Sequence, residues 1–398
     1  MLFKNDFFVL LCLVFIQASA ITQSMEILEN FQQEEEEKWI WGVSPASNEN
    51  KTQNRLSRLS ESDNVTETQV NPCEIEPPKM PDYKAPGRRI SSVKCLEYIW
   101  TITAREDEHI RLEECEKFLH GTVVLPAIGG RVTDPGEFPH MGAIGWKASV
   151  GQWVFKCGGS LISNKFVLTA AHCSKASERD TTIADVDPKI VRLADRNILE
   201  RDIYGYNNAH LDATILRVIN HPDYKPPKKY NDIAIIELKN AVGFDKYVQP
   251  ACLYTGPDTE LSGKKASMTE WGVVETVNRT ISPDLQVVEL DLLDSHLCDD
   301  LLNTSCNRLW CGMQDHQICA GVLAGGIDAC QGDSGGPLQL KILLQQRRPF
   351  CSLNHSCMRM YNIIGVTSFG VGCALPNLPG VYTRVSSYLD WIEGIVWK

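Results

Sequence analysis

The distribution of apolar residues divides the chain into two unlike parts near residue 127. Downstream, short apolar runs alternate with Gly, Pro, Asn and Asp, a pattern typical of many short strands joined by turns. The expected strands are Met141–Trp146, Phe166–Ala170, Ile233–Leu238, Ile363–Ser368 and Gly380–Val385. The helical spacing of apolar residues in Ser387–Trp397 predicts a C-terminal helix. Residues 127–398 are therefore expected to form an all-β domain of barrels or sandwiches.

The part upstream of residue 127 has two different textures. Residues 21–72 are rich in Glu, Gln, Asn and Ser, with the acidic run Glu34–Glu37, and carry too little apolar surface to offset chain entropy. This acidic segment is expected to be largely disordered. Residues 73–126 contain Pro-rich and basic stretches and three cysteines, and we interpret them as a pro-segment or linker. One helix is expected there, from about Glu106 to Leu119.

The first residues of the chain predict export. Lys4 precedes an apolar run from Phe7 to Ile16, which ends in the small residues Ala18-Ser19-Ala20. This order is typical of a signal peptide over 1–20, so the mature chain would begin near Ile21. A membrane anchor is the alternative, but the run is shorter than the ~20 residues that a membrane-spanning helix needs. The sequence therefore predicts a secreted, extracellular protein without a membrane anchor.

Cysteine content and charge agree with export. The chain has 15 cysteines, and setting aside Cys12 in the leader leaves an even number, which predicts a disulfide framework. Metal binding is the alternative, but no closely spaced Cys and His set resembles a zinc site. The net charge of −11 argues against a nucleic-acid partner. Sequons for glycosylation occur at Asn50, Asn64, Asn278, Asn303 and Asn354.

Three short stretches carry the candidate chemistry. His172 follows an apolar run and precedes Cys173, and Asp232 stands before another apolar run. Each of these two residues, taken alone, is better read as structural. Ser334 is more specific, because the glycines of Gly332-Asp333-Ser334-Gly335-Gly336-Pro337 let backbone amides approach a substrate carbonyl. Together the three residues supply a nucleophile, a general base and an orienting acid.

In the order His, Asp, Ser, these motifs resemble those of the chymotrypsin-like, trypsin-type serine endopeptidases. The resemblance covers the chain from Ala127 to Lys398. It implies two six-stranded antiparallel barrels with the active site between them. It also implies that His172, Asp232 and Ser334 are catalytic and that the backbone amides of Gly332 and Ser334 form the oxyanion hole. No cofactor or metal is expected.

The same resemblance implies the substrate preference. Asp328, six residues before Ser334, would lie at the base of the pocket for the residue that precedes the cleaved bond. Ser368, Gly370 and Gly380 would form the pocket walls, where the glycines leave room for a long side chain. A carboxylate at the base would select a cationic side chain, so cleavage after Arg or Lys is expected.

The resemblance further implies part of the disulfide framework. The implied pairs are Cys157–Cys173, Cys330–Cys373, Cys298–Cys319 and Cys115–Cys252. The last of them would keep the pro-segment joined to the catalytic domain after activation. The partners of the remaining cysteines stay open, and local pairing within each insertion is the simplest hypothesis for Cys73, Cys95, Cys306, Cys311, Cys351 and Cys357.

Within the family, three phrases resemble the arthropod snake and easter group of clip-type proteases. These phrases are Asp134–Met141, Val218–Tyr224 and Gly365–Gly370. The resemblance implies a role in an extracellular cascade of clotting, melanisation, immunity or patterning, or in saliva or venom. Expected partners are extracellular protein substrates, an activating protease and serpin-type inhibitors. A complete clip module needs six cysteines, whereas three lie upstream of the catalytic domain, so no folded clip module is expected.

Activation presents an atypical junction. Zymogens of this family are cut to free a terminus whose ammonium pairs with the aspartate beside the serine, here Asp333. Aligning the glycines of Leu125-Pro126-Ala127-Ile128-Gly129-Gly130 puts Ala127 at the new terminus, after Pro126. A trypsin-like activator is not expected to cut there. Three routes of activation remain open: cleavage by an activator of unusual specificity, trimming in two steps, or poor activation.

Two other functions compete with a cascade protease. The atypical activation junction makes a non-catalytic decoy that binds proteases conceivable. The intact set of His172, Asp232 and Ser334 argues against this function. A digestive enzyme would have a short pro-peptide, which the long upstream segment disfavours. For the loop from Asp195 to Asp202, calcium binding through oxygen ligands is the alternative to an ordinary polar loop.

Overall fold

A computed structural model describes most of the region downstream of the acidic segment. The described residues are 73, 76–120, 136–195, 197–198, 210–261, 263–271, 273–275, 280–281, 284–325, 334–344, 359–370 and 375–398. The expected leader and acidic segment, 1–72, lie outside these residues.

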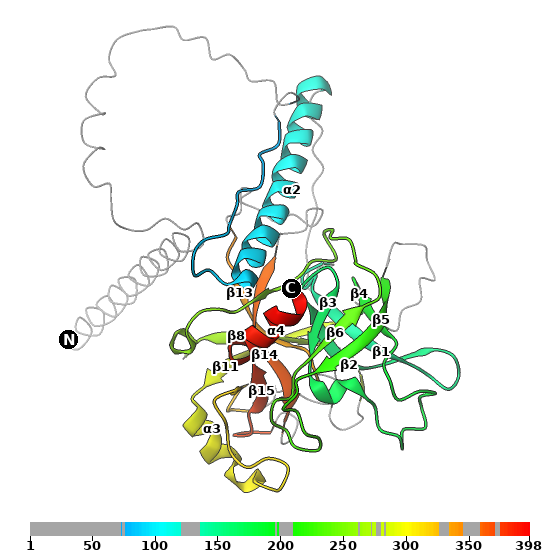
Figure 1. Ribbon diagram of the computed structural model, residues 1–398, viewed down its shortest axis with the longest axis vertical. Coiled ribbons are helices and arrows are strands. Elements are labelled where there is room, and N and C mark those ends of the chain that lie inside the picture. Colours follow the sequence, from blue (N-terminus) through cyan, green and yellow to red (C-terminus); the bar gives the residue numbers. More distant parts are fainter. Residues whose placement is uncertain are drawn as a thin grey trace, which may run out of the picture. The chain divides into compact units, whose positions relative to one another are not determined.

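Six strands form the first barrel (Figure 1). They are β1 (Met141–Lys147), β2 (Trp153–Leu161), β3 (Phe166–Thr169), β4 (Ile190–Leu193), β5 (Leu211–Asn220) and β6 (Ala234–Leu238). Antiparallel pairing in the order β1-β2-β3-β6-β5-β4 closes the barrel. Its interior is filled by large apolar side chains, among them Ile144, Leu161 and Ile235, which are completely buried.

The second barrel also has six antiparallel strands. They are β8 (Lys265–Glu270), β11 (Gln286–Leu293), β12 (Gln317–Gly321), β13 (Pro337–Ile342), β14 (Met360–Phe369) and β15 (Gly380–Arg384). The order is β13-β8-β11-β12-β15-β14, and pairing of β13 with β14 closes it. The predicted pair of six-stranded barrels is thus confirmed.

Shorter elements complete the second half of the chain. Strand β7 (Cys252–Leu253) pairs in parallel with β14, while β9 (Val273–Glu275) and β10 (Thr280–Ile281) form a separate two-stranded sheet. Helix α3 (Ser295–Leu302) begins after Asp294, whose side chain accepts a hydrogen bond from the His296 amide at 2.9 Å and caps the helix.

The expected C-terminal helix is present. A 3₁₀ turn, Val385–Tyr388, leads into helix α4 (Leu389–Val396). Leu389, Ile392 and Val396 are buried and belong to the apolar cluster of the first barrel. The helix therefore follows the last strand of one barrel and packs on the core of the other.

The helix upstream of the barrels is longer than expected. Helix α2 extends from Ile90 to His120, whereas the sequence predicted a helix only from about Glu106. Its first half is rich in β-branched residues, which lower helix propensity. Burial compensates, because Val93, Ile99 and Ile102 are 3–4% exposed. Tertiary packing, which local propensity does not reveal, thus extends the helix.

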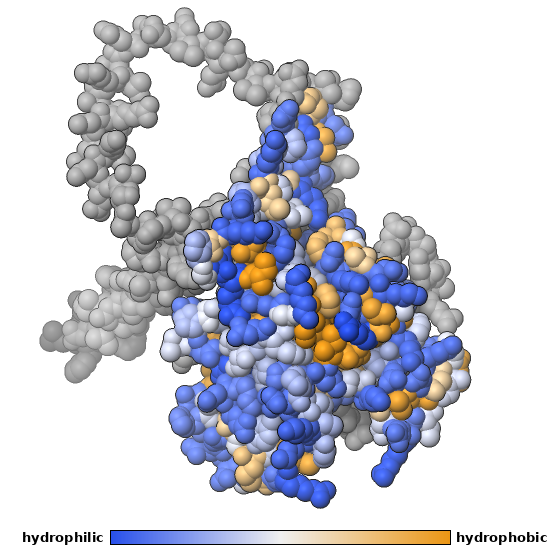
Figure 2. Space-filling view, in the orientation of Figure 1, coloured by the Kyte–Doolittle hydropathy of each residue, from blue (hydrophilic) through white to orange (hydrophobic). Residues whose placement is uncertain are grey.

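Polar contacts attach α2 to the C-terminal helix. The Arg89 guanidinium donates to both carboxylate oxygens of Glu393, at 3.1 and 2.9 Å, and also pairs with Asp390. The Ser91 backbone amide donates to Glu393 as well, at 3.2 Å. Beyond Ile102, none of the side chains of α2 that the structure describes is buried. Hydrophilic residues accordingly predominate on the projecting part of α2 (Figure 2).

No helix among the described residues is both long enough and apolar enough to cross a lipid bilayer.

Two of the expected disulfides in the barrels are present, whereas the pairing expected for the upstream cysteines differs from the one observed. Cys157–Cys173 and Cys298–Cys319 are present, and Cys306 pairs locally with Cys311. The expected bond between Cys115 and Cys252 is wrong. Cys252 is bonded to Cys95, and Cys115 is bonded to Cys73.

Helix geometry explains this correction. Cys95 and Cys115 lie about 30 Å apart along the axis of one helix. Only the first half of α2 packs against the barrels, next to β7, which contains Cys252. Cys95 is therefore the cysteine within reach of the barrels, and Cys115 fastens the upstream chain at Cys73 to the projecting half of the helix.

Candidate active site

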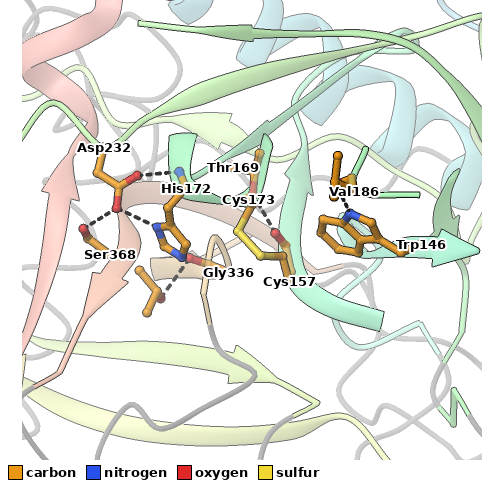
Figure 3. The surroundings of a disulfide bond; sticks show 11 residues. Trp146, Cys157, Thr169, His172, Cys173, Val186, Asp232, Gly336 and Ser368 are labelled. Carbon is orange, nitrogen blue, oxygen red and sulfur yellow. Dashed lines mark hydrogen bonds and ion pairs between the residues drawn. A yellow bond between two sulfur atoms is a disulfide. The ribbon is translucent and has the colours of Figure 1, made fainter. Parts of the chain in front are cut away.

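A disulfide fixes the segment that carries His172. The residue lies in the 3₁₀ turn Ala171–Ser174, directly after β3. Cys173, next to it, is bonded to Cys157 of β2 (Figure 3). The imidazole is 32% exposed, which leaves part of the ring accessible to a substrate. His172 is thus a partly open side chain on a rigidly attached turn.

Asp232 is buried behind His172 and oriented by two of its groups. The His172 backbone amide donates to Asp232 Oδ1 at 2.9 Å, and His172 Nδ1 lies 2.7 Å from Asp232 Oδ2. The aspartate side chain is only 4% exposed. Because an ionised carboxylate is acceptor-only, Nδ1 carries the proton in this contact. The opposite nitrogen, Nε2, is then free to accept a proton.

Two further side chains hold the aspartate. Ser368 Oγ donates to Asp232 Oδ2 at 2.6 Å, and Thr383 Oγ1 donates to the Asp232 carbonyl oxygen at 2.8 Å (Figure 3 shows Ser368). These residues come from the adjacent strands β14 and β15 of the second barrel, whereas Asp232 immediately precedes the β6 region of the first. The carboxylate thus joins the two barrels.

The environment keeps Asp232 ionised. Burial on its own would raise the pKa of this carboxyl group, but the charge of His172 and hydrogen bonds from His172 and Ser368 outweigh burial and lower the pKa below its ordinary value. The negative charge can therefore stabilise an imidazolium when His172 takes up a proton.

Ser334 lies between the elements that hold the other two residues. Its carbonyl oxygen accepts a hydrogen bond from the Gly158 amide at 2.8 Å, next to the Cys157–Cys173 bond. The amide of Gly335 donates to the Thr367 carbonyl at 2.9 Å, next to Ser368. Ser334 and His172, both described, share no hydrogen bond, and such contacts in unliganded enzymes often form only with substrate.

The residue after the serine has to be glycine. Gly335 has a φ of +78°, and a Cβ there would clash with Thr169 Oγ1 and lie 2.6 Å from the Gly158 carbonyl oxygen. A side chain would push the Ser334 turn away from β2 and β3. The glycine noted in the sequence is therefore needed for close packing of the serine segment against the first barrel.

The pocket residues are described only in part. Gly370 directly follows β14 and is exposed, and Gly380 begins β15, the neighbouring strand. The other residues of the expected site lie outside the described residues. They are Asp328, Gly332 and Asp333, the cysteines Cys330 and Cys373, and Ala127 at the expected new terminus.

One cluster of possible metal ligands, and the described carboxylates near the expected calcium loop, have partners within the chain itself. Ligand atoms of Cys157, His172 and Cys173 lie within 4.8 Å of one another, but the two sulfur atoms form a disulfide and offer no thiolate. In the loop from Asp195 to Asp202, Glu200 and Asp202 lie outside the described residues. The Arg192 guanidinium lies 3.7 Å from Asp195 and 2.7 Å from Asp212 of β5. A cation from the chain itself thus occupies the position next to these carboxylates.

A buried histidine predicts acid sensitivity of the fold. His140, just before β1, is 1% exposed, and among the described residues no group forms a hydrogen bond of normal geometry with its Nε2. Burial lowers the pKa of His140 to about 4, although Gln339 opposes the shift. The unfolded chain takes up this proton near pH 6.5, whereas the folded chain does not until about pH 4. This difference should reduce the free energy of unfolding as the pH falls, by about 3 kcal/mol in total.

Urea unfolding at pH 7 and pH 4.5 measures this effect. Wild type is expected to lose about 2–3 kcal/mol more stability between the two pH values than His140→Gln. His109→Gln, which alters a histidine side chain that is 56% exposed, serves as the matched control and should behave like wild type. An identical pH dependence for wild type and His140→Gln would contradict the prediction.

Known proteins resemble this chain over more than two thirds of its length. The family profile described as Trypsin matches residues 127–392. Serine protease snk of Drosophila melanogaster is 36% identical over 326 residues, 78% of this chain and 66% of that protein. Serine protease Hayan of the same organism is 40% identical over 297 residues, 73% of this chain and 42% of that protein. The proclotting enzyme of Tachypleus tridentatus is 33% identical over 276 residues, 69% of this chain and 67% of that protein.

These matches confirm the resemblance to the snake group that the sequence indicates. The chain spans just under two thirds of the length of serine protease snk and less than half of the length of Hayan. Two closed barrels, an aspartate–histidine pair between them and a profile match over 127–392 lead to one conclusion: the chain belongs to the trypsin family of serine proteases.

Proposed function

We propose that the chain is the zymogen of a secreted serine endopeptidase that hydrolyses peptide bonds after Arg or Lys. The observation that carries this proposal is the contact between His172 and the buried Asp232, with the Ser334 segment fastened to β2 and β14 beside it. A purely structural ion pair would not need a partly exposed imidazole, and it would not need a serine followed by a glycine of positive φ.

In the proposed mechanism, His172 takes up one proton and gives it back in each half of the reaction. His172 Nε2 takes the hydroxyl proton of Ser334 while the oxygen attacks the substrate carbonyl, and an acyl-enzyme forms when the amine leaves with that proton. Water then attacks in the same way and releases the acid. Asp232 stabilises the imidazolium, and the amides of Gly332 and Ser334 stabilise the oxyanion by about 3–4 kcal/mol per donor.

Activation is proposed to require a cut that frees Ala127 to pair with Asp333. Its small side chain would fill the apolar socket less well than Ile, at a cost of about 1–3 kcal/mol by analogy with core truncation. The segment with α2 would stay attached to the catalytic domain after this cut, through Cys95–Cys252 and the Arg89–Glu393 pair.

Relatives suggest the setting of this activity. One matched protein is called a proclotting enzyme and another a phenoloxidase-activating factor. We therefore place the chain in an extracellular proteolytic cascade, with an activating protease, protein substrates and serpin-type inhibitors as partners. Saliva or venom is the alternative setting. A non-catalytic decoy is the competing function, favoured only by the Pro126–Ala127 junction.

Peptide hydrolysis by the processed protein tests the specificity. Fluorogenic peptides that differ only in the residue before the cleaved bond should be cut after Arg and Lys, but not after Gln or Met. Asp328→Ser should lower kcat/KM for the Arg peptide by about 10²- to 10³-fold, because the substrate cation loses its buried partner.

Asp300→Ser, which removes an exposed aspartate in α3, is the matched control and should leave cleavage unchanged. Equal cleavage after Arg and Gln, or an Asp328→Ser protein with wild-type kcat/KM, would overturn the proposed specificity. The assignment of Ser334 as nucleophile would not be affected by that outcome.

A further inference from the structure

A second histidine contacts the residue that precedes the candidate catalytic aspartate. His316 lies directly before β12, and its Nε2 is 3.3 Å from the Asn231 backbone nitrogen, in hydrogen-bonding geometry. A backbone amide can only donate a hydrogen bond, so Nε2 is the acceptor and the neutral ring carries its proton on Nδ1. His316 takes no part in the proton transfers proposed for His172, yet it is linked through one residue to Asp232.

Asn231 has a backbone conformation that depends on such contacts. Its φ is +55°, in the left-handed region that residues other than glycine rarely adopt. The Tyr388 hydroxyl donates to Asn231 Oδ1 at 2.8 Å, and the Asn231 carbonyl accepts from the Ile233 amide at 2.9 Å. With His316 on its amide, the residue is held at its side chain, its carbonyl and its amide. The turn at Asn231 sets the direction of the next side chain, so these contacts help to aim the Asp232 carboxylate at the catalytic imidazole.

His316 is itself held in one orientation. The Arg384 amide donates to the His316 carbonyl at 2.9 Å, and the Arg384 guanidinium donates to the carbonyls of the residues on either side. The imidazole lies edge-to-face with the rings of Tyr230 and Tyr388, at 6.1 Å between centroids in both cases. The acceptor nitrogen is therefore fixed in front of the Asn231 amide by the backbone of the second barrel and by two aromatic rings.

This contact depends on the charge of the ring. An imidazolium donates from both nitrogens and cannot accept from an amide. Burial lowers the pKa of the half-buried His316 below its ordinary value, Asp315 opposes this shift, and the charge of His221 adds to it. The ring is therefore neutral at pH 7 and takes up its proton only below pH 6.5. The other titratable or charged groups next to the ring or its aromatic neighbours are Tyr230, Tyr388, Arg384, Asp223 and Asp232.

We propose that His316 is a positioning residue for the catalytic aspartate, and that only its neutral form holds Asn231 and Asp232 in the active arrangement. The inference rests on the proposed function and deepens it by adding a second proton-dependent group to the site. Proton uptake turns Nε2 into a donor that faces the donor of Asn231, so the left-handed turn loses one support. Cleavage therefore falls more steeply towards acid pH than protonation of His172 alone requires.

The pH dependence of kcat/KM tests this role in the processed, full-length protein with a fluorogenic Arg peptide. A range from pH 5 to pH 8 stays above the pKa of about 4 of the buried His140. In His316→Gln, an amide oxygen replaces Nε2 as the acceptor and does not titrate. This variant is expected to keep kcat within about twofold of wild type at pH 8. Between pH 8 and pH 5 its kcat/KM should fall about three- to fivefold less than that of wild type.

His316→Phe keeps an aromatic ring next to the two tyrosines but offers no acceptor. Its kcat at pH 8 is expected to be about tenfold below that of wild type, because the carboxylate that orients His172 is less well placed. KM should change little, since Asp232 is buried behind His172. His296→Gln, which removes an exposed histidine of α3, is the matched control and should keep the wild-type pH dependence.

A merely structural role for His316 would lower kcat/KM by the same factor at every pH in both variants, and that result would overturn the inference. So would a wild-type kcat for His316→Phe at pH 8. Urea midpoints at pH 8 show whether the variants are folded, and His316→Gln carries the test if His316→Phe is not. If wild type cuts no Arg peptide at any pH, the proposed function fails and the inference fails with it. Cleavage after Arg with the same pH profile in wild type and His316→Gln removes the inference alone.

Discussion

Ser334→Ala is expected to lower kcat for an Arg peptide by about 10⁶-fold, the largest effect of any single change in this chain. The reason is that a methyl group cannot attack a carbonyl, and the remaining groups provide only binding and oxyanion stabilisation. His172→Ala should cost about as much, because the two residues act as one unit. The measurement is kcat on the processed protein with saturating peptide.

The double variant Ser334→Ala/His172→Ala distinguishes this unit from two independent contributions. Its kcat should be close to that of either single variant. Losses that multiply in the double variant would contradict a shared role. Ser334→Ala should retain the urea midpoint of wild type within experimental error, since the Ser334 side chain is partly exposed.

Asp232→Asn is expected to lower kcat by about 10⁴-fold with little change in the fold. In wild type, Asp232 Oδ2 accepts from both His172 Nδ1 and Ser368 Oγ, at 2.7 and 2.6 Å. An amide nitrogen in that position would donate to Nδ1 and move the imidazole proton to Nε2. That nitrogen then could not accept the proton of Ser334.

Ser368→Ala is the comparison for this variant, because it removes one donor and leaves the carboxylate in place. Its effect on kcat should be far smaller than that of Asp232→Asn. If both variants lost activity equally, the tautomer argument would be wrong, and the role of Asp232 would lie in packing. If Asp232→Asn kept wild-type kcat, the aspartate would not belong to the catalytic unit.

The sequence predicted much of the fold because strand and turn signals are local. The five strands expected from apolar runs correspond to β1, β3, β6, β14 and β15, with ends that differ by a few residues. The start of α2 could not be predicted in this way. Ile99 and Ile102 are poor helix formers, and the helix persists there because they are buried against the catalytic domain.

Contacts between distant parts of the chain explain the other differences. Cys252 is bonded to Cys95 and not to Cys115. The sequence could not predict this choice, because it does not show which cysteine of the helix faces the barrels. The hydroxyl of Ser368, predicted as a pocket wall, proved to donate to Asp232, 136 residues away in sequence.

The most direct test of the central claim is labelling of the processed, secreted protein with a fluorophosphonate, beside Ser334→Ala, followed by N-terminal sequencing of the labelled chain. This reagent reacts with a serine only when a base activates the hydroxyl. Our account predicts labelling of wild type and none of Ser334→Ala, on a chain that begins at Ala127. Wild type that stays unlabelled after processing would contradict the account and favour a protease-binding decoy.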